Sequence, residues 1–275
     1  MKPLLLFITN LDHEDREEDL FLIEKLSEKF QITVTNPEQA LLIIKYFSHC
    51  IIRNAWPSRI FKDALKKIHK RKISGKIKIY NSINRTFIEN KSYLISLYES
   101  SYPTIPTYLN TKQMLDNGYE NNSLVLLKPV DGCSSWGILK NTLWVLVDVS
   151  WYILQPIIDF KYEISLFFID WAYTYSVRSK DKENRWELIE FIPSRKDIAW
   201  AKRFILWNSS FQYGIQRIDA MRLHDDSLLL VEIEDSMCYL SLLQLWEGTR
   251  TIVIEKLSWS ILRNLFCIDN HPNVG

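Results

Sequence analysis

Hydrophobic and polar positions follow two different patterns along the chain, and the first covers its N-terminal part. Short apolar runs are separated there by amphipathic segments, in which hydrophobic residues recur at helical spacing. The runs predict four strands: LLLFIT (4–9), QITVT (31–35), HCIIRNAW (49–56) and KIKIYN (76–81). One helix is predicted to begin near residue 15, a second to end near residue 46, and a third to include the basic segment 62–78. Strands that alternate with helices are typical of a small parallel α/β domain.

A second pattern begins near residue 90. Residues 90–100 predict a helix that ends before YPTIPT, because proline cannot continue a helix. The strands predicted after it are LVLLK, LWVLVDV (143–149), YILQPII (152–158), EISLFFID (163–170), AYTYSVR (172–178), and the hairpin RIDAMRL and SLLLVEIE, turned by HDD. Helices are predicted around residues 199–208, 239–247 and 251–265. This part is therefore expected to be antiparallel sheet with few helices.

Composition agrees with a globular protein of two or three subdomains. The chain has 275 residues, of which 47% are hydrophobic, and a net charge of +1. A charge so close to zero gives no indication of a nucleic-acid or anionic-membrane partner. The apolar run in MKPLLLFITNLDHED is too short for a signal peptide or a membrane span. We therefore expect a cytoplasmic protein.

The exception to this charge balance is the segment KDALKKIHKRKISGKIK (62–78). Phe61, Leu65 and Ile68 recur there at helical spacing, which makes the lysines the solvated face of an amphipathic helix. A patch that contacts phosphate or RNA is the alternative.

The cysteines and histidines suggest no site. The cysteines lie far apart, without a CxxC motif or a histidine at ligand spacing, so neither a zinc site nor a disulfide framework is expected; they are Cys50, Cys133, Cys238 and Cys267. No histidine has a serine or cysteine partner that the sequence identifies, so a nucleophilic triad is not expected either.

The stretch SLVLLKPVDGCSSWGI (123–138) combines a lysine at a strand end with a turn of small residues. Lys128 supplies a point charge, and the turn can present backbone N–H groups to anionic oxygens; its small residues are Gly132, Ser134, Ser135 and Gly137. The stretch is not a Walker A loop, because it lacks GK[ST]. It predicts a phosphate-binding loop, with an ordinary β-turn as the alternative.

Three carboxylates occupy the two predicted strands near the C-terminal end. Alternation along the strands places Asp219, Glu232 and Glu234 on one sheet face. The condition is that the apolar residues beside them point into the core, namely Ile218, Val231 and Ile233. Three carboxylates on one face repel one another without a cation, and Mg²⁺ prefers such oxygen ligands together with substrate phosphates. A solvated acidic rim is the alternative.

The order of these motifs resembles the ATP-grasp superfamily, specifically its glutathione synthetase-like carboxylate–amine ligases. The similar segments are IIRNAW, NKSYL with PTIPTYL, LVLLKP with its small-residue loop, YILQPII, YEISLFFID, RIDAM and VEIEDSMCYLSL. The resemblance implies an N-terminal Rossmann-like pre-ATP-grasp domain (1–83), a lid subdomain (84–158), and a C-terminal subdomain with a metal site (159–275). Two antiparallel-sheet subdomains would then grip ATP.

The same resemblance implies roles for individual residues. Lys91 and Lys128 would hold the phosphates and adenine of ATP, Gln155 and the backbone of Ile157 the adenine, and Glu163 the ribose. The phosphate loop would contribute Ser134, Ser135 and Gly137, and the ligands of Mg²⁺ or Mn²⁺ would be Asp219, Glu232 and Glu234.

Three arginines complete the expected site. Arg217 lies two residues before Asp219, on the same strand face, and is expected to stabilise an acyl phosphate and the tetrahedral intermediate; a salt bridge is its alternative. Arg185 is expected to be catalytic, or else an exposed loop arginine. Arg53 is expected to bind an acidic substrate, or else to cap a strand end.

Two segments depart from the family pattern. Met237 and Cys238 stand where relatives usually have an acidic or amide residue followed by proline, so one metal ligand is in doubt. The loop KDKENRWEL contains Arg185 but no glycine, unlike the corresponding loop of relatives.

The resemblance implies an ADP-forming ligase. The γ-phosphoryl group of ATP would pass to a carboxylate, and an amine would then attack the acyl phosphate. The substrates would be small molecules or peptides, as in natural-product biosynthesis, and the enzyme a homodimer or homotetramer. A nucleotide-binding module with weak or no ligase activity, and a kinase on the same fold, are the alternatives.

Overall fold

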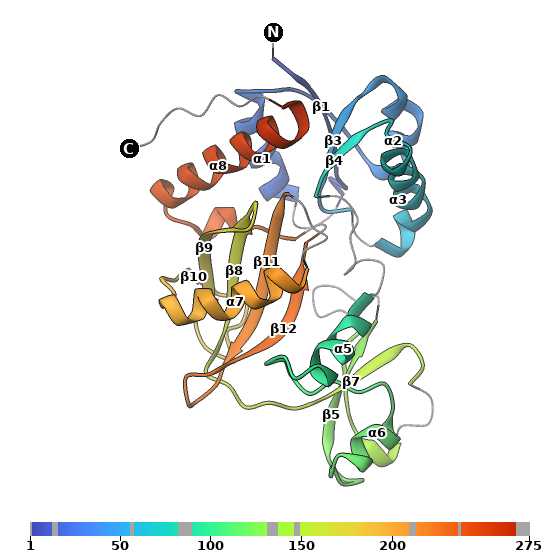
Figure 1. Ribbon diagram of the computed structural model, residues 1–275, viewed down its shortest axis with the longest axis vertical. Helices are drawn as coiled ribbons and strands as arrows, with labels where there is room; N and C mark the ends of the chain where they lie inside the picture. Colours follow the sequence, from blue (N-terminus) through green and yellow to red (C-terminus); the bar gives the residue numbers. More distant parts are fainter. Residues whose placement is uncertain are drawn as a thin grey trace.

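The computed structural model describes residues 2–12, 16–55, 58–81, 90–130, 137–145, 149–208, 213–235 and 238–267. Within these ranges the strands form one parallel and two antiparallel sheets, with helices between and around them (Figure 1). The expected mixed α/β architecture, with its change from parallel to antiparallel sheet, is confirmed.

The N-terminal sheet is parallel and has the strand order β2-β1-β3-β4. Its strands are β1 (Leu4–Ile8), β2 (Gln31–Thr35), β3 (His49–Ile52) and β4 (Lys78–Tyr80). The helices that connect them are α1 (Arg16–Ser27), α2 (Pro37–Ile43) with the 3-10 turn η1 (Ile44–Tyr46), and α3 (Ser58–Ile73). Residues 5–8 of β1 are fully buried, because helices cover both faces of a parallel sheet.

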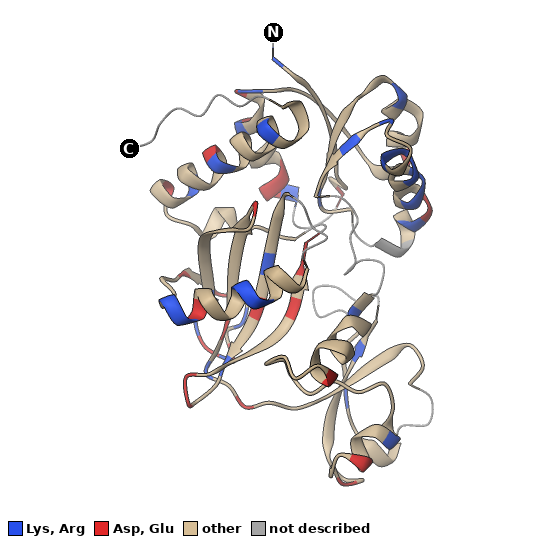
Figure 2. Cartoon of the chain, in the orientation of Figure 1, with Lys and Arg blue, Asp and Glu red and all other residues tan. Residues whose placement is uncertain are grey.

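Helix α3 carries the basic segment. Phe61, Leu65 and Ile68 are buried against the parallel sheet, as their helical spacing predicts. Lysine and arginine residues are concentrated along this helix at the edge of the molecule (Figure 2). The amphipathic interpretation of this segment is thus confirmed for its apolar face.

A small antiparallel sheet has the order β6-β5-β7, and this sheet with its helices is called the lid below. Its strands are β5 (Leu124–Pro129), β6 (Leu139–Thr142) and β7 (Tyr152–Pro156), and its helices are η2 (Asn90–Ser92), α5 (Tyr93–Glu99) and α6 (Thr111–Asp116). The strand predicted at 143–149 is wrong in its described part, since residues 143–145 form a 3-10 turn, η3 (Leu143–Val145). Leu143 enters the lid core while Trp144 and Val145 face solvent, so this apolar run does not alternate as a strand would.

The large sheet is antiparallel and has the order β10-β9-β8-β11-β12. Its strands are β8 (Tyr162–Ile169), β9 (Ala172–Ser179), β10 (Leu188–Glu190), β11 (Ile215–Arg222) and β12 (Leu228–Glu234). Helix α7 (Arg195–Trp207) lies across one face (Figure 1), where it shares a hydrophobic core with α5 of the lid. On the opposite face, Phe167, Tyr175 and Val177 pack into a second hydrophobic core, and the rest of this face carries polar side chains that include Glu163, Ser165 and Asp219.

The C-terminal helix α8 (Glu247–Phe266) packs beside α1 and joins the large sheet to the N-terminal domain. The helix predicted at 239–247 is wrong, because this segment contains only the 3-10 turn η4 (Leu242–Gln244). The backbone N–H groups of Leu240 and Leu242 instead donate to the buried carboxylate of Glu18. Within the described ranges, no helix is both long and apolar enough to cross a membrane.

Candidate functional site

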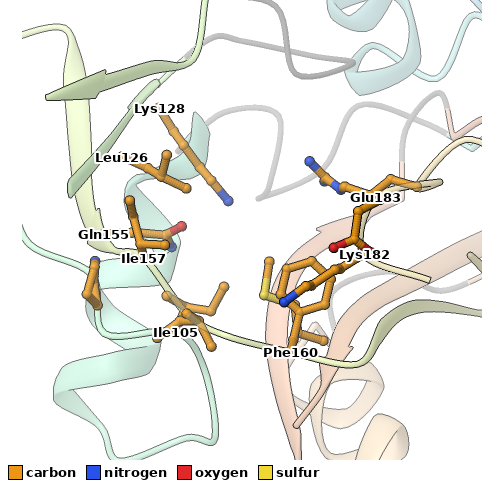
Figure 3. Close-up of a pocket in the computed structure, with 12 residues that line it drawn as sticks. Ile105, Leu126, Lys128, Gln155, Ile157, Phe160, Lys182 and Glu183 are labelled. Carbon is orange, nitrogen blue, oxygen red and sulfur yellow. The ribbon is translucent and has the colours of Figure 1, made fainter. Parts of the chain in front are cut away.

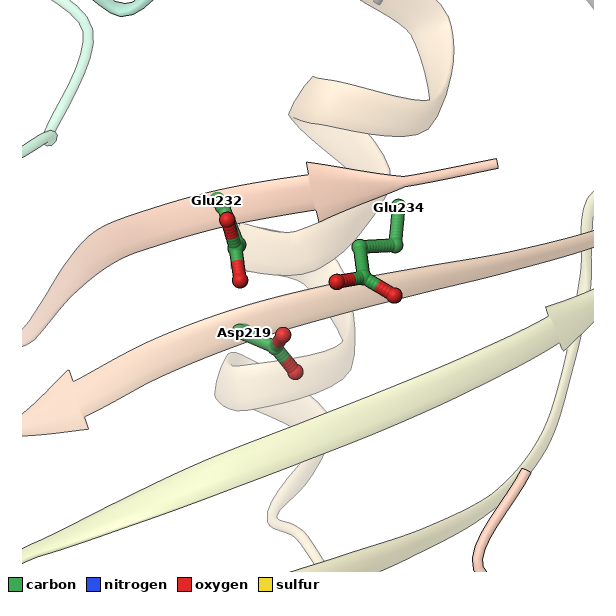
Figure 4. A group of neighbouring side chains, drawn as sticks. All are labelled: Asp219, Glu232 and Glu234. Atoms are coloured by element: carbon green, nitrogen blue, oxygen red, sulfur yellow. The ribbon is translucent and has the colours of Figure 1, made fainter. Parts of the chain in front are cut away.

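The three carboxylates predicted to share a face converge beside the lid (Figure 4). Asp219 lies on β11, and Glu232 and Glu234 lie on the neighbouring strand β12. One carboxylate oxygen of each lies within 4.8 Å of the others. Three half-buried carboxylates at this spacing can share a divalent cation.

A β-bulge in β12 makes this convergence possible. Asp219 of β11 pairs with Glu232, but the next residue, Ala220, pairs with Leu230. Val231 is therefore the additional residue, unopposed by a residue of β11. A bulge of this kind shifts the alternation of side chains by one position.

The shift separates the apolar and acidic halves of β12. Leu228 and Leu230 are buried before the bulge, and Ile233 is buried after it. Regular alternation would have placed Glu232 on the same side as Leu230, inside the core. The expectation that Val231 points into the core is wrong, because Val231 is the half-buried bulge residue. Because of this bulge, Glu232 and Glu234 both lie on the polar face of the sheet.

Two cations of the chain neutralise the cluster. Lys91, on η2 of the lid, places its Nζ 2.6 Å from Oε2 of Glu232. Arg217 places its Nη2 2.9 Å from Oδ2 of Asp219 and 3.1 Å from Oε1 of Glu234. The salt bridge considered as the alternative role for Arg217 is thus present. The acidic cluster belongs to a charge network and is not a solvated rim.

The network acts differently on the two glutamates. Burial raises the pKa of a carboxyl group, but for Glu232 the lysines Lys91 and Lys128 outweigh burial and lower the pKa to about 2. For Glu234, burial prevails over Arg217 and the pKa is raised. Of the two glutamates, Glu234 is thus the one whose charged form is disfavoured in the ligand-free protein.

A cavity of about 340 Å³ lies between the lid and the large sheet (Figure 3). The side chains that line it from the lid are Ile105, Leu126, Lys128, Gln155, Pro156 and Ile157. Facing them are Ile158, Phe160, Lys182, Glu183, Arg185 and Met221. Its walls are largely apolar, with a few polar groups at defined positions, which is typical of a small-molecule site.

Lys128 links this cavity to the acidic cluster. Its side chain points from β5 into the cavity (Figure 3) and only 7% of the residue is exposed. Burial lowers the pKa of Lys128 to about 8, while Glu232 and Glu163 oppose the shift and Lys91 adds to it. These interactions join residues of the lid and of the large sheet in a single charged site.

A second ion pair stands at the cavity. Arg185, in the connection between β9 and β10, places its Nη2 2.7 Å from Oε1 of Glu163 on β8. Burial raises the pKa of Glu163, although Arg185 opposes it. Arg185 lines the cavity, and 39% of its side chain is exposed. It therefore lies in a loop, as the alternative role required, but it also faces the proposed site.

Comparison with known proteins by sequence gives no match, either to a protein-family model or to a curated protein. Solved structures do match. D-cycloserine synthetase DcsG has a TM-score of 0.74 at 17% identity, covering 94% of this chain and 99% of that chain. The ATP-grasp ligase PsnB, complexed with a precursor variant, Mg and ADP, has a TM-score of 0.65 at 11% identity, covering 95% and 98%. D-alanine–D-alanine ligase from Bacillus anthracis has a TM-score of 0.67 at 14% identity, covering 96% and 98%.

The chain has the ATP-grasp fold. Because each match covers at least 94% of this chain, the similarity extends over the N-terminal parallel sheet as well as the two antiparallel sheets. The cavity lies between the two antiparallel parts of this fold, and the acidic cluster lies on the large sheet beside it.

The loop between β5 and β6 is described only at its end. Ser134 and Ser135 lie outside the described residues, as does Met237 after β12. Gly137 has a φ of +74°, and a Cβ atom at this position would lie 3.0 Å from Cγ of Pro129. Glycine is therefore required where the loop returns to the end of β5.

Arg53 lies at the end of β3, away from the cavity. Its side chain is 4% exposed and pairs with Glu18 Oε1 at 2.8 Å and Asp19 Oδ1 at 3.1 Å, and it donates to the carbonyl of Cys238. Burial favours the neutral form, but Asp19 and Glu18 outweigh it and raise the pKa of Arg53. These contacts favour a structural role, joining α1 to the segment after β12. The substrate role expected for Arg53 stays a prediction.

We expect Arg53→Met to destabilise the protein by about 3–5 kcal/mol, because it leaves the buried carboxylates of Glu18 and Asp19 without their cation. Urea unfolding would measure the change. Arg195→Met, at an exposed position on α7, should change the stability by less than about 0.5 kcal/mol. A normally stable Arg53→Met protein that had lost substrate binding would instead support the substrate role.

Two polar contacts of the site escaped the sequence analysis. Ser165 on β8 lies opposite Asp219 and donates to its Oδ1 at 2.6 Å. Its position two residues after Glu163, on the same strand face, was an available signal. The carbonyl of Tyr239 accepts from Nη1 of Arg217 at 2.9 Å. A backbone acceptor in an irregular segment has no signature in the sequence.

Proposed function

We propose that this protein is an ATP-dependent ligase, which activates a carboxylate as an acyl phosphate and condenses it with an amine. The observation that carries the proposal is the charged site joining the cavity to the acidic cluster through Lys128. The structural similarity to ligases supports it, since the matching proteins include a D-alanine–D-alanine ligase and the ATP-grasp ligase PsnB. Small molecules and peptides are both proposed as substrates.

In this proposal the nucleotide lies in the cavity, with its base against the apolar walls. Lys128 and Lys91 neutralise the phosphates, assisted by the loop that contains Ser134, Ser135 and Gly137. Gln155 and the backbone of Ile157 contact the base. Glu163 binds the ribose, which requires it to exchange its ion pair with Arg185 for the sugar hydroxyls.

The acidic cluster fits Mg²⁺ or Mn²⁺. Its hard carboxylate oxygens lie within 4.8 Å of one another, and these ions prefer a few carboxylates together with phosphate oxygens. When bound, the ion would offset charge on the transferring phosphate. The residues proposed to hold it are Asp219, Glu232 and Glu234. Lys91 and Arg217 pair with these carboxylates in the structure, and with a metal ion bound there both side chains would be available to contact the substrates.

The chemistry proposed has two steps. A carboxylate oxygen of the substrate attacks the γ-phosphorus, and the bond to the bridging oxygen breaks with its electrons leaving on ADP. The amine then attacks the acyl carbon, loses a proton, and expels inorganic phosphate. Arg217 is proposed to stabilise the negative charge of the acyl phosphate and the tetrahedral intermediate, and Arg185 to assist at the mouth of the cavity.

The proposal is tested with hydroxylamine as a universal amine. The protein is incubated with MgATP, hydroxylamine and a panel of amino acids and short peptides, and ADP and hydroxamate are measured together. We expect at least one carboxylate to give equal amounts of ADP and hydroxamate, because hydroxylamine captures an acyl phosphate.

A hydroxamate-free reaction that leaves a stable phosphorylated product would indicate a kinase. Nucleotide binding without release of ADP from any mixture would indicate a binding module. Either result contradicts the ligase proposal. The double control omits either the carboxylate or hydroxylamine, because a ligase needs both for product formation.

A further inference from the structure

The charge of this chain is divided unevenly between helix α3 and the rest. Residues 58–73 contain seven lysine or arginine residues and a single aspartate, which gives the helix a net charge of +6. Of the 34 basic and 33 acidic residues of the whole chain, 27 and 32 therefore lie elsewhere and give a net charge of −5. The excess of positive charge belongs to one helix at the edge of the molecule (Figure 2).

The exposed lysines of α3 form a row along the helix. Lys62, Lys66 and Lys70 follow one another at intervals of four residues, and all three are exposed. Residues four apart lie on the same side of a helix, about 6 Å apart along its axis. Lys67 and the half-buried Arg71 form a second row beside the first. The outer face of α3 is thus a strip of positive charge about 12 Å long.

This row does not stabilise the helix that carries it. Like charges at positions i and i+4 repel each other and destabilise a helix, whereas a carboxylate at one of the two positions would stabilise it. The helix dipole favours basic residues in the last turn only, and Lys62 and Lys66 lie before that turn. The fold of α3 therefore gives no reason for the row.

The pairing of another helical lysine shows the contrast. Lys112 on α6 pairs with Asp116, four residues later, at 2.5 Å. In the part of the chain that the structure describes, no carboxylate pairs with Lys66 or Lys70. The charges of the row are thus available to a partner from outside the chain.

We propose that the exposed face of α3 binds an acidic peptide segment in an extended conformation. Alternate side chains of an extended segment lie on the same side, about 6.6 Å apart. This spacing is close to the distance of about 6 Å between successive lysines of the row, so carboxylates at every second position would meet Lys62, Lys66 and Lys70. Such binding requires neither a nucleotide nor a metal ion, so the inference does not depend on the proposed function.

The charge outside α3 favours a short partner. Nucleic acids and anionic membranes extend well beyond a helix of about 24 Å, and they would meet the net negative charge of the other residues. An extended segment of about seven residues covers α3 and reaches no further. An acidic peptide is therefore the partner that this distribution of charge fits.

Binding is tested with a fluorescently labelled peptide of alternating glutamate and alanine, followed by anisotropy at low salt. We expect the wild type to bind this peptide and to release it as salt is added, because exposed charges are screened. The double variant Lys66→Gln, Lys70→Gln should bind at least about fivefold more weakly, because two charge pairs are lost. Its melting temperature should not fall, since glutamine forms helices about as well as lysine and a repulsion is removed.

The double variant Lys196→Gln, Lys202→Gln is the matched control, because it removes two exposed lysines from α7 and changes the net charge equally. It should bind the peptide as the wild type does. Equal weakening in both double variants would mean that only net charge matters, and it overturns the inference. Failure of the folded wild type to bind the peptide at low salt also overturns it. Tighter binding of a single-stranded RNA of the same length, or of phosphatidylserine vesicles, overturns it in favour of that partner. MgATP binding, measured separately, tests the proposed function whichever result is found.

Discussion

Lys128→Met is expected to weaken MgATP binding by about 10- to 100-fold, because it removes a buried charge proposed to contact the phosphates. Methionine retains much of the apolar stem, so the packing of β5 is preserved. Calorimetric titration with MgATP would measure the loss. Lys112→Met provides the control, since this lysine lies on the lid with 82% of its side chain exposed. It should bind MgATP as the wild type does.

The same variant should not unfold. The pKa of Lys128 is lowered to about 8 by burial, which means that its charged form is disfavoured in the folded, ligand-free protein. The unfolded chain has the ordinary, higher pKa, so the penalty is present at neutral pH and disappears as the pH rises past the unfolded value. Removing the charge should leave the melting temperature unchanged or raise it. Unaltered MgATP binding by this stable variant would contradict the phosphate role of Lys128.

Glu234→Gln is expected to reduce ADP formation by roughly 100-fold or more, because the cluster loses one charged ligand for the metal ion. A second readout does not depend on turnover. Binding of Mn²⁺ in the presence of ADP, followed by electron paramagnetic resonance, should weaken by about tenfold or more. Glutamine keeps the size of glutamate, so the shape of the site changes little.

Glu234 suits this experiment because its pKa is raised by burial, so its charge already destabilises the ligand-free protein. The variant should be at least as stable as the wild type. Glu187→Gln removes an exposed carboxylate that pairs with Lys180, and should affect neither readout. Wild-type Mn²⁺ affinity in Glu234→Gln would remove Glu234 from the proposed ligands and leave only Asp219 and Glu232.

Local patterns predicted the sheets, because the spacing of apolar residues within a segment indicates which face of a strand or helix is buried. Leu65 and Ile68 of α3 and the continuous buried run of β1 are examples. The pattern failed at residues 143–145, which form a 3-10 turn in which Leu143 is buried in the small core and Trp144 and Val145 are exposed. It also failed at Leu240, whose N–H group is bound by Glu18, 222 positions earlier.

The candidate site likewise has a part that the sequence predicted and a part that it did not. The acidic residues of β11 and β12 were found because their spacing along two adjacent strands placed them together. The contacts of Arg53 and the orientation of Gln155 were not predictable, since each depends on partners from distant segments: Asp19 is 34 positions from Arg53, and Thr107 is 48 positions from Gln155. Side-chain hydrogen bonds of this range leave no periodicity in a sequence.

The bulge at Val231 limits which changes of length the hairpin β11–β12 can accept. Residues inserted at the turn, between Leu223 and Ser227, lie outside both paired halves and leave every facing side chain in place. Deletion of Val231 would remove the bulge and leave Leu230 and Glu232 as consecutive residues on opposite faces, whereas deletion of Ile233 would turn Glu232 and Glu234 to opposite faces. Homologous chains with this site are therefore expected to vary in hairpin length at the turn and in the presence of the bulge residue, and to keep a single residue between the two glutamates.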